Sequence, residues 1–77
     1  MRSFEDWVKE TLREINKADI EDKYKIYLLA ELKALKELRH RDEFRIAIEL
    51  FIAILHRYKL QNLCPTQEEI QYWILRG

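Results

Sequence analysis

The run from Phe44 to Leu55 constrains this chain more than any other stretch of its sequence. Its only polar residues are Arg45 and Glu49, which are four apart and therefore lie on one narrow strip of a helix. A helix that is apolar around most of its circumference has to be buried from several sides. We therefore expect the other segments to fold as a cover for this one.

Length and composition favour a single all-α domain spanning residues 1–77. The chain has 77 residues, 48% of them hydrophobic, and only one Gly and one Pro, so its loops must be short. Apolar residues recur with the helical period, and no stretch alternates as a strand would. We predict a small helical bundle around a buried third helix, with helices at approximately 4–16, 20–39, 43–60 and 67–75.

Local signals support the first two helices. Ser3 and Asp6 resemble a capping box ahead of an apolar face that starts at Phe4, and Asp19 is the expected cap of the second helix. Polar residues 39–43 then interrupt the apolar stripe for more than one turn. A turn there is favoured over one continuous helix, because a small domain needs both apolar faces folded onto each other.

The third helix carries two apolar stripes. The first contains Phe44, Ala47, Ile48, Phe51, Ile52, Leu55 and Tyr58, and the second contains Ile46, Leu50, Ala53 and Ile54. A last helix of about nine residues is too short to help cover both. One end of the third helix, or the surfaces around Trp7 and Trp73, should then remain exposed.

The clearest break is the segment 61–65, which ends in Pro65. Thr66 and Glu69 then form a capping box that opens the last helix. Residues 65–70, Pro-Thr-Gln-Glu-Glu-Ile, resemble the opening of the first helix of a helix-turn-helix unit in bacterial and archaeal regulators. The resemblance covers about ten residues and no recognition helix follows, so the DNA-reading function of that family does not carry over.

Charge and cysteine content exclude several classes of protein. Lys plus Arg and Asp plus Glu are fourteen each, which argues against a protein built mainly to coat nucleic acid. The single cysteine, Cys64, is expected to be a small buried residue. No signal peptide or membrane-spanning run is evident, so a soluble, cytoplasmic protein is expected. The enrichment of Lys and Glu is typical of thermophilic proteins and of highly helical ones alike.

Catalytic chemistry has little support in the sequence. Arg45, Glu49 and His56 share one helix face and would allow acid–base work, but such a strip is more often the solvated edge of a core helix. Glu37 and His40 have the Glu-x-x-His spacing in a single copy, whereas di-metal bundles use two. We expect no enzyme activity, cofactor, metal site or small-molecule substrate.

Two surfaces remain as candidate binding sites. The aromatic and apolar residues Trp7, Tyr72, Trp73 and Leu75 are candidate anchors for a protein partner or a second copy. The most basic neighbourhood contains Lys33, Lys36, Arg39, His40 and Arg41, and it would contact phosphates weakly because acidic residues interleave with it. The leading hypothesis is a non-enzymatic interaction module. It would be an accessory or regulatory subunit of a larger complex, with nucleic-acid-processing complexes among the candidates, or a homo-oligomer. The alternative is a small DNA-binding regulator that uses the basic neighbourhood.

Overall fold

The computed structural model describes residues 1–76 as a four-helix bundle without strands in that range. The helices are α1 (Phe4–Lys17), α2 (Asp22–Glu37), α3 (Phe44–Arg57) and α4 (Gln67–Arg76), with a short 3-10 helix, η1 (Gln61–Leu63), before α4. The predicted all-α class and the four helices are confirmed. The observed helix ends differ from the predicted ones by at most three residues, a difference that is common for helix ends.

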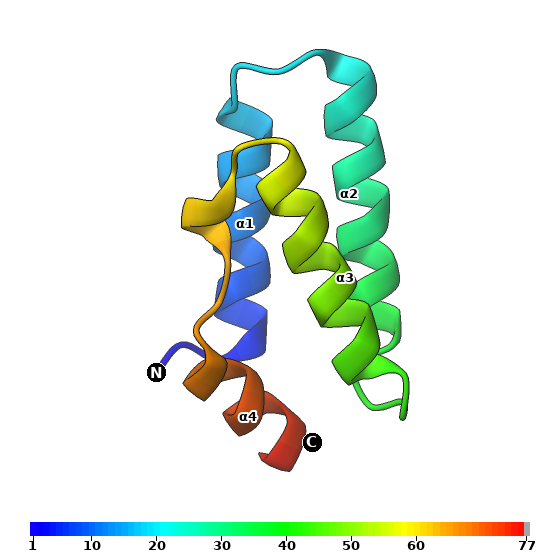
Figure 1. Cartoon of the computed structure of the whole chain (residues 1–77), viewed down its shortest axis with the longest axis vertical. Coiled ribbons are helices and arrows are strands. Elements are labelled where there is room, and N and C mark those ends of the chain that lie inside the picture. Colours follow the sequence, from blue (N-terminus) through cyan, green and yellow to red (C-terminus); the bar gives the residue numbers. More distant parts are fainter. Residues whose placement is uncertain (77) are drawn as a thin grey trace.

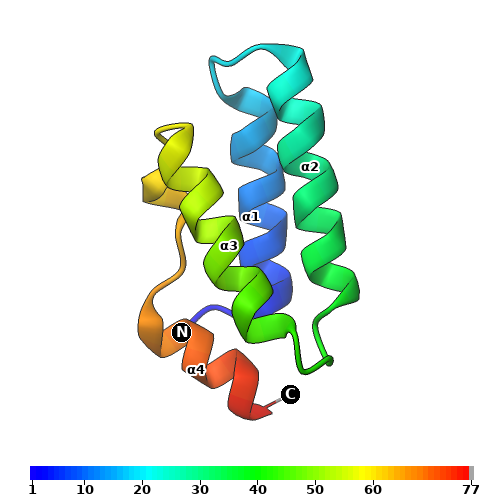
Figure 2. The same cartoon turned by 45° about the vertical axis from the view of Figure 1, so that its right-hand side comes forward.

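Three helices run up and down, and the fourth closes one end. Figure 1 shows α1 and α2 as an antiparallel pair, with α3 returning beside α2 and lying in front of α1. The segment after α3 runs back down the bundle, and α4 crosses the end at which α1 begins (Figures 1 and 2). The N-terminus therefore lies next to α4.

A side-chain cap sets the start of α1 but not the start of α2. The Asp6 N–H donates to Ser3 Oγ at 3.0 Å, which confirms the predicted cap of α1. The prediction that Asp19 caps α2 is wrong, because α2 begins at Asp22 and Glu21 takes the cap position without a side-chain hydrogen bond. The predicted turn at residues 39–43 is confirmed, since α2 ends at Glu37 and α3 starts at Phe44.

The third helix is shorter than predicted because it ends in a Schellman motif. The Leu60 N–H donates to Leu55 O at 2.8 Å and the Lys59 N–H donates to His56 O at 3.0 Å. Lys59 adopts a left-handed backbone with φ of 59°, a conformation that normally favours glycine. Without a Gly or Pro at this point, the sequence carries no local signal for the stop.

One stripe of α3 is buried and the other is not. Phe44, Ile48, Phe51 and Leu55 pack into the core against α1, α2 and α4 residues. Ile46 and Leu50, on the second stripe, are 64% and 61% exposed. In both views no other segment of the described chain passes in front of α3 (Figures 1 and 2). The third helix is therefore buried on its inner side only.

Replacing Ile48 with Asp should abolish cooperative unfolding. Ile48 is fully buried, so its substitution places an unpaired carboxylate in the core, which costs several kcal/mol against a total of about 5 kcal/mol for a small domain. Thermal unfolding followed by circular dichroism measures the effect. Ile46→Asp on the outer side of the same helix is the control and should change stability by about 0.5 kcal/mol or less. Equal losses for both variants would contradict the one-sided burial of α3.

Candidate functional site

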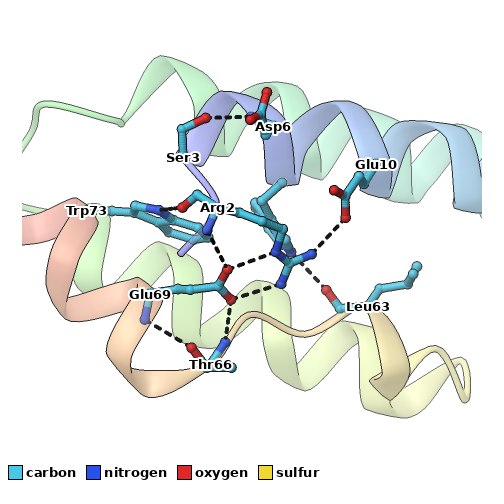
Figure 3. Close-up of polar contacts among 9 residues, drawn as sticks. Arg2, Ser3, Asp6, Glu10, Leu63, Thr66, Glu69 and Trp73 are labelled. Atoms are coloured by element: carbon cyan, nitrogen blue, oxygen red, sulfur yellow. Dashed lines mark hydrogen bonds and ion pairs between the residues drawn. The ribbon is translucent and has the colours of Figure 1, made fainter.

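The two tryptophans lie in the core rather than on the surface. Trp7 and Trp73 are fully buried, and their ring centroids are 5.4 Å apart. Trp7 Nε1 donates to Leu63 O at 2.8 Å, and Trp73 Nε1 donates to Arg2 O at 3.0 Å (Figure 3). The expectation that these residues form an exposed contact surface is wrong, because the fold satisfies both the rings and their N–H groups.

A polar cluster, here called the terminal clasp, joins the start of the chain to α4. The Arg2 guanidinium donates to both carboxylate oxygens of Glu69 at 2.8 Å and to Glu10 Oε2 at 2.9 Å (Figure 3). The Thr66 N–H donates to Glu69 Oε1 at 2.9 Å, and Thr66 Oγ1 accepts from the Glu69 N–H at 3.0 Å. The predicted capping box at Thr66 and Glu69 is confirmed, and the clasp extends it.

The clasp fixes the charge on Glu69. Hydrogen bonds from Arg2 and the Thr66 N–H lower the pKa of Glu69 to about 2, against the opposing effect of its burial. Hydrogen bonds to Glu69 and Glu10 raise the pKa of Arg2. Both groups stay ionised and bound to each other at any neutral pH, so neither is available as a general acid or base. The clasp is therefore a structural element that holds α4 in place.

Two of the predicted partner residues remain accessible on α4. Leu75 is 79% exposed, and Tyr72 is also exposed, with the Arg76 guanidinium 5.5 Å from its ring centroid. On the opposite side of α4, Glu69, Ile70 and Trp73 are buried. Of the four predicted partner residues, only Tyr72 and Leu75 can therefore take part in a contact that leaves the fold intact.

A further accessible apolar feature is the outer side of α3, which exposes Ile46 and Leu50. We call it the α3 seam and define it by Glu43, Ile46, Ala47, Leu50, Ala53, Ile54 and Arg57. Ile46, Leu50 and Ala53 are exposed, and the flanking Ala47 and Ile54 are half-buried. At 3.6 residues per turn, Ile46 and Leu50 lie on the side of the helix opposite Ile48 and Leu55. The sequence assigned Ile46 and Leu50 to the second stripe. It predicted exposure at one end of this helix or around the tryptophans rather than along this side.

Charged residues close both ends of the α3 seam. Glu43 precedes the first turn of α3, and Arg57 is its last residue. Within residues 1–76, neither side chain takes part in an ion pair or a side-chain hydrogen bond. The α3 seam is therefore an apolar stripe with an unpaired anion at one end and an unpaired cation at the other.

The predicted basic neighbourhood surrounds a hollow at the turn between α2 and α3. This corner hollow has a volume of about 390 Å³ and is lined by Arg39, His40, Arg41, Asp42, Phe44, Arg45 and Ile74. Arg45 is a member that the sequence reasoning did not assign to it. Lys36 lines a neighbouring hollow beside Phe4 and Val8, and Lys33 is exposed on α2 and lines neither hollow. The structure thus brings three of the five predicted basic residues together.

Arg39 is held in place by aromatic rings. Its guanidinium carbon is 5.2 Å from the ring centroids of both Phe4 and Phe44. Its Nε is buried and has no hydrogen-bond partner in the described chain, and no carboxylate lies within ion-pair distance. A guanidinium fixed in this way keeps unused donors next to the corner hollow.

The other candidate reactive side chains, Cys64 and the strip of Arg45, Glu49 and His56, do not form a catalytic arrangement. Cys64 Sγ lies 3.8 Å from His56 Nδ1, but burial raises the pKa of the thiol. His56 Nδ1 also lies 3.0 Å from Ile52 O, which only accepts, so that nitrogen carries the proton and cannot take one from Cys64. Arg45, Glu49 and His56 are exposed side chains with no bond between them in residues 1–76. No cluster of three or more His, Cys, Asp or Glu residues suited to a metal occurs there either.

Comparison with protein-family models, curated proteins and solved structures finds no match to this chain. Among the described helices, none combines the length and the apolar character needed to cross a lipid bilayer. The α3 seam and the corner hollow are the two candidate sites of function on the described surface.

Acid should destabilise the protein through Glu69. Because the folded pKa of about 2 lies below the ordinary value of 4.5, the stabilisation is present above about pH 4.5 and is lost as the pH falls towards 2. Glu69→Gln keeps a capping side chain but removes the charge, and should cost about 2 kcal/mol at pH 7 and flatten this acid limb. Urea unfolding at several pH values measures both effects.

Glu10→Gln is the matched control. The Glu10 side chain is the more exposed partner of Arg2, so its loss should cost less than about 1 kcal/mol and leave the acid limb in place. An unchanged acid limb in Glu69→Gln would show that the clasp does not govern acid stability.

Proposed function

We propose that this chain is a non-enzymatic protein-interaction module, an accessory or regulatory subunit of the cytoplasm, and that it binds through the α3 seam. The observation that carries the proposal is the exposure of Ile46 and Leu50 on the outer side of a helix whose inner side is buried in the core. Contiguous apolar surface bordered by charges is typical of protein contact sites. Its partner is expected to present an apolar helix face of similar length.

The packing of the rest of the chain supports this choice of surface. The fold buries both tryptophans and the inner stripe of α3, so the core does accept large side chains. A small core therefore does not explain why the outer stripe is exposed. Folding alone gives no reason to keep Ile and Leu at positions 46 and 50, where polar residues would be tolerated. An apolar pair at these positions is explained by a partner that covers it.

A second candidate function is contact with a phosphate backbone at the corner hollow. The fixed, unpaired guanidinium of Arg39 favours it, together with the neighbouring Arg41 and Arg45. Asp42 lines the same hollow and the net charge of the chain is zero, so the attraction of the corner hollow for a phosphate backbone is weak and short in range. This supports a contact made inside a larger assembly rather than a regulator that finds DNA alone.

A charge placed in the α3 seam should prevent partner capture without unfolding the domain. Immobilised protein is incubated with a lysate of the source organism, and each captured protein, including copies of the chain itself, is then purified and titrated directly. Ile46→Glu should weaken the direct binding at least about tenfold, because it buries a carboxylate against an apolar surface.

Ile26→Glu is the matched control for this experiment. Ile26 is also an isoleucine in mid-helix, is 69% exposed, and lies on the side of α2 opposite its buried residues. It should bind like the unmodified chain. Equal binding by the Ile46 variant, or an equal loss in the Ile26 variant, would remove the α3 seam from the proposal.

Duplex DNA should bind weakly, without sequence preference, and dissociate almost completely at about 0.15 M salt. Replacing Arg41 and Arg45 together by Ala should abolish the residual low-salt binding, whereas Lys33→Ala, outside the hollow, should reduce it little. Fluorescence anisotropy of a labelled duplex across a salt series measures this. Tight binding at 0.15 M salt would make nucleic-acid recognition the leading function.

A further inference from the structure

We infer that the partner of the α3 seam is a second copy of this chain, whose α3 packs antiparallel to the first across a two-fold axis at Leu50. The inference rests on the proposed function, because it names the occupant of the same surface. Three properties of the α3 seam carry it: the symmetric placement of its residues, the matching of large with small side chains, and the charges at its ends.

The residues of the α3 seam are placed symmetrically about Leu50. Alanines stand three positions away on each side, at Ala47 and Ala53, and isoleucines stand four positions away, at Ile46 and Ile54. The charged residues Glu43 and Arg57 stand seven positions away. A two-fold axis that relates antiparallel helices brings each such position to the height of its counterpart. The α3 seam is therefore complementary to the α3 seam of a second copy in the antiparallel orientation.

Large side chains meet small ones in this arrangement. At 3.6 residues per turn, Ile46 and Ala53 lie on one flank of Leu50, and Ala47 and Ile54 lie on the other. The two-fold axis sets each flank against the same flank of the second copy, so Ile46 packs beside the partner's Ala53. By the same symmetry, Ile54 packs beside the partner's Ala47. Such alternation lets side chains from facing helices interdigitate.

The end charges specify the antiparallel direction. In the antiparallel pair, Glu43 of each copy faces the partner's Arg57, which gives one ion pair at each end. A parallel pair would place Glu43 beside Glu43 and Arg57 beside Arg57, and like charges at facing positions repel. Both side chains are free of ion pairs within the described single chain, so the dimer breaks no existing contact.

The size of the α3 seam indicates a reversible dimer. From Glu43 to Arg57 the α3 seam spans fourteen helical steps, which is roughly 21 Å at 1.5 Å per residue. One helix pair of this length is a small interface, and total interfaces under about 1,200 Å² are weak or transient. The zero net charge of the chain adds no overall repulsion between copies. We therefore expect dissociation constants in the micromolar range or weaker.

Sedimentation equilibrium on the unmodified chain tests the inference. The average mass should rise with concentration from 9.5 kDa towards twice that value. Leu50→Glu places two carboxylates together at the axis and should keep the protein monomeric at every concentration. Ile26→Glu should dimerise like the unmodified chain. If circular dichroism shows that Leu50→Glu has unfolded, Ala53→Glu, at a small exposed position of the same seam, takes its place.

Charge reversal tests the antiparallel register. Glu43→Arg should weaken dimerisation roughly tenfold, and so should Arg57→Glu, because each creates two like-charge contacts at the ends. The double variant with both reversals restores both ion pairs and should dimerise within about threefold of the unmodified chain. Single reversals that leave the dimer unchanged would overturn the antiparallel register.

The outcomes separate this inference from the proposed function. A strict monomer up to millimolar concentration, with Ile46→Glu still losing a different purified partner, would overturn the second copy as occupant and leave the interaction module standing. A dimer that forms equally well with Leu50→Glu would overturn the α3 seam as its interface. A dimer lost in Leu50→Glu, retained in Ile26→Glu and rescued by the double charge reversal supports the arrangement in full.

Discussion

The structure depends on the burial of two tryptophans whose tilted rings pack together at the junction of α1 and α4. Trp7 and Trp73 lie 5.4 Å apart, and Phe4 contacts both, with ring centroids 5.9 Å and 5.4 Å away. Each indole N–H donates to a backbone carbonyl outside the four α-helices, at Leu63 in η1 and at Arg2. The aromatic burial supplies free energy, and the two hydrogen bonds fix where the connecting segments run.

The terminal clasp complements this apolar junction. Arg2 ties the N-terminal segment to α4 twice (Figure 3): its guanidinium binds the Glu69 carboxylate, and its backbone carbonyl accepts a hydrogen bond from the Trp73 indole N–H. Because α4 is a short helix, it would be marginal by itself, and its position comes from tertiary contacts. The capping box at Thr66 gives the helix its start, and Arg2 joins the same carboxylate to the other end of the chain.

The position of α4 at the end of the bundle explains why the outer side of α3 is exposed. Because α4 packs across the end of the bundle, no segment of residues 1–76 covers the outer side of α3 (Figures 1 and 2). The inner side of α3 stabilises the monomer through Ile48 and Leu55, while the outer side carries Ile46 and Leu50 into solvent. The same helix thus stabilises the fold with one face and, in our proposal, binds a partner with the other.

The sequence alone determined the all-α class, the four helices, the turn at residues 39–43 and the caps at Ser3 and Thr66, because these depend on periodicity and on contacts within a few residues. The sequence also predicted two apolar stripes on α3, but periodicity does not determine which stripe a neighbouring helix covers. Only the tertiary structure decided that Trp7 and Trp73 are buried, that Arg2 binds Glu69 across 67 positions, and that Arg45 joins Arg39 at the corner hollow. Each of these depends on how the helices pack in space, which the local sequence does not encode.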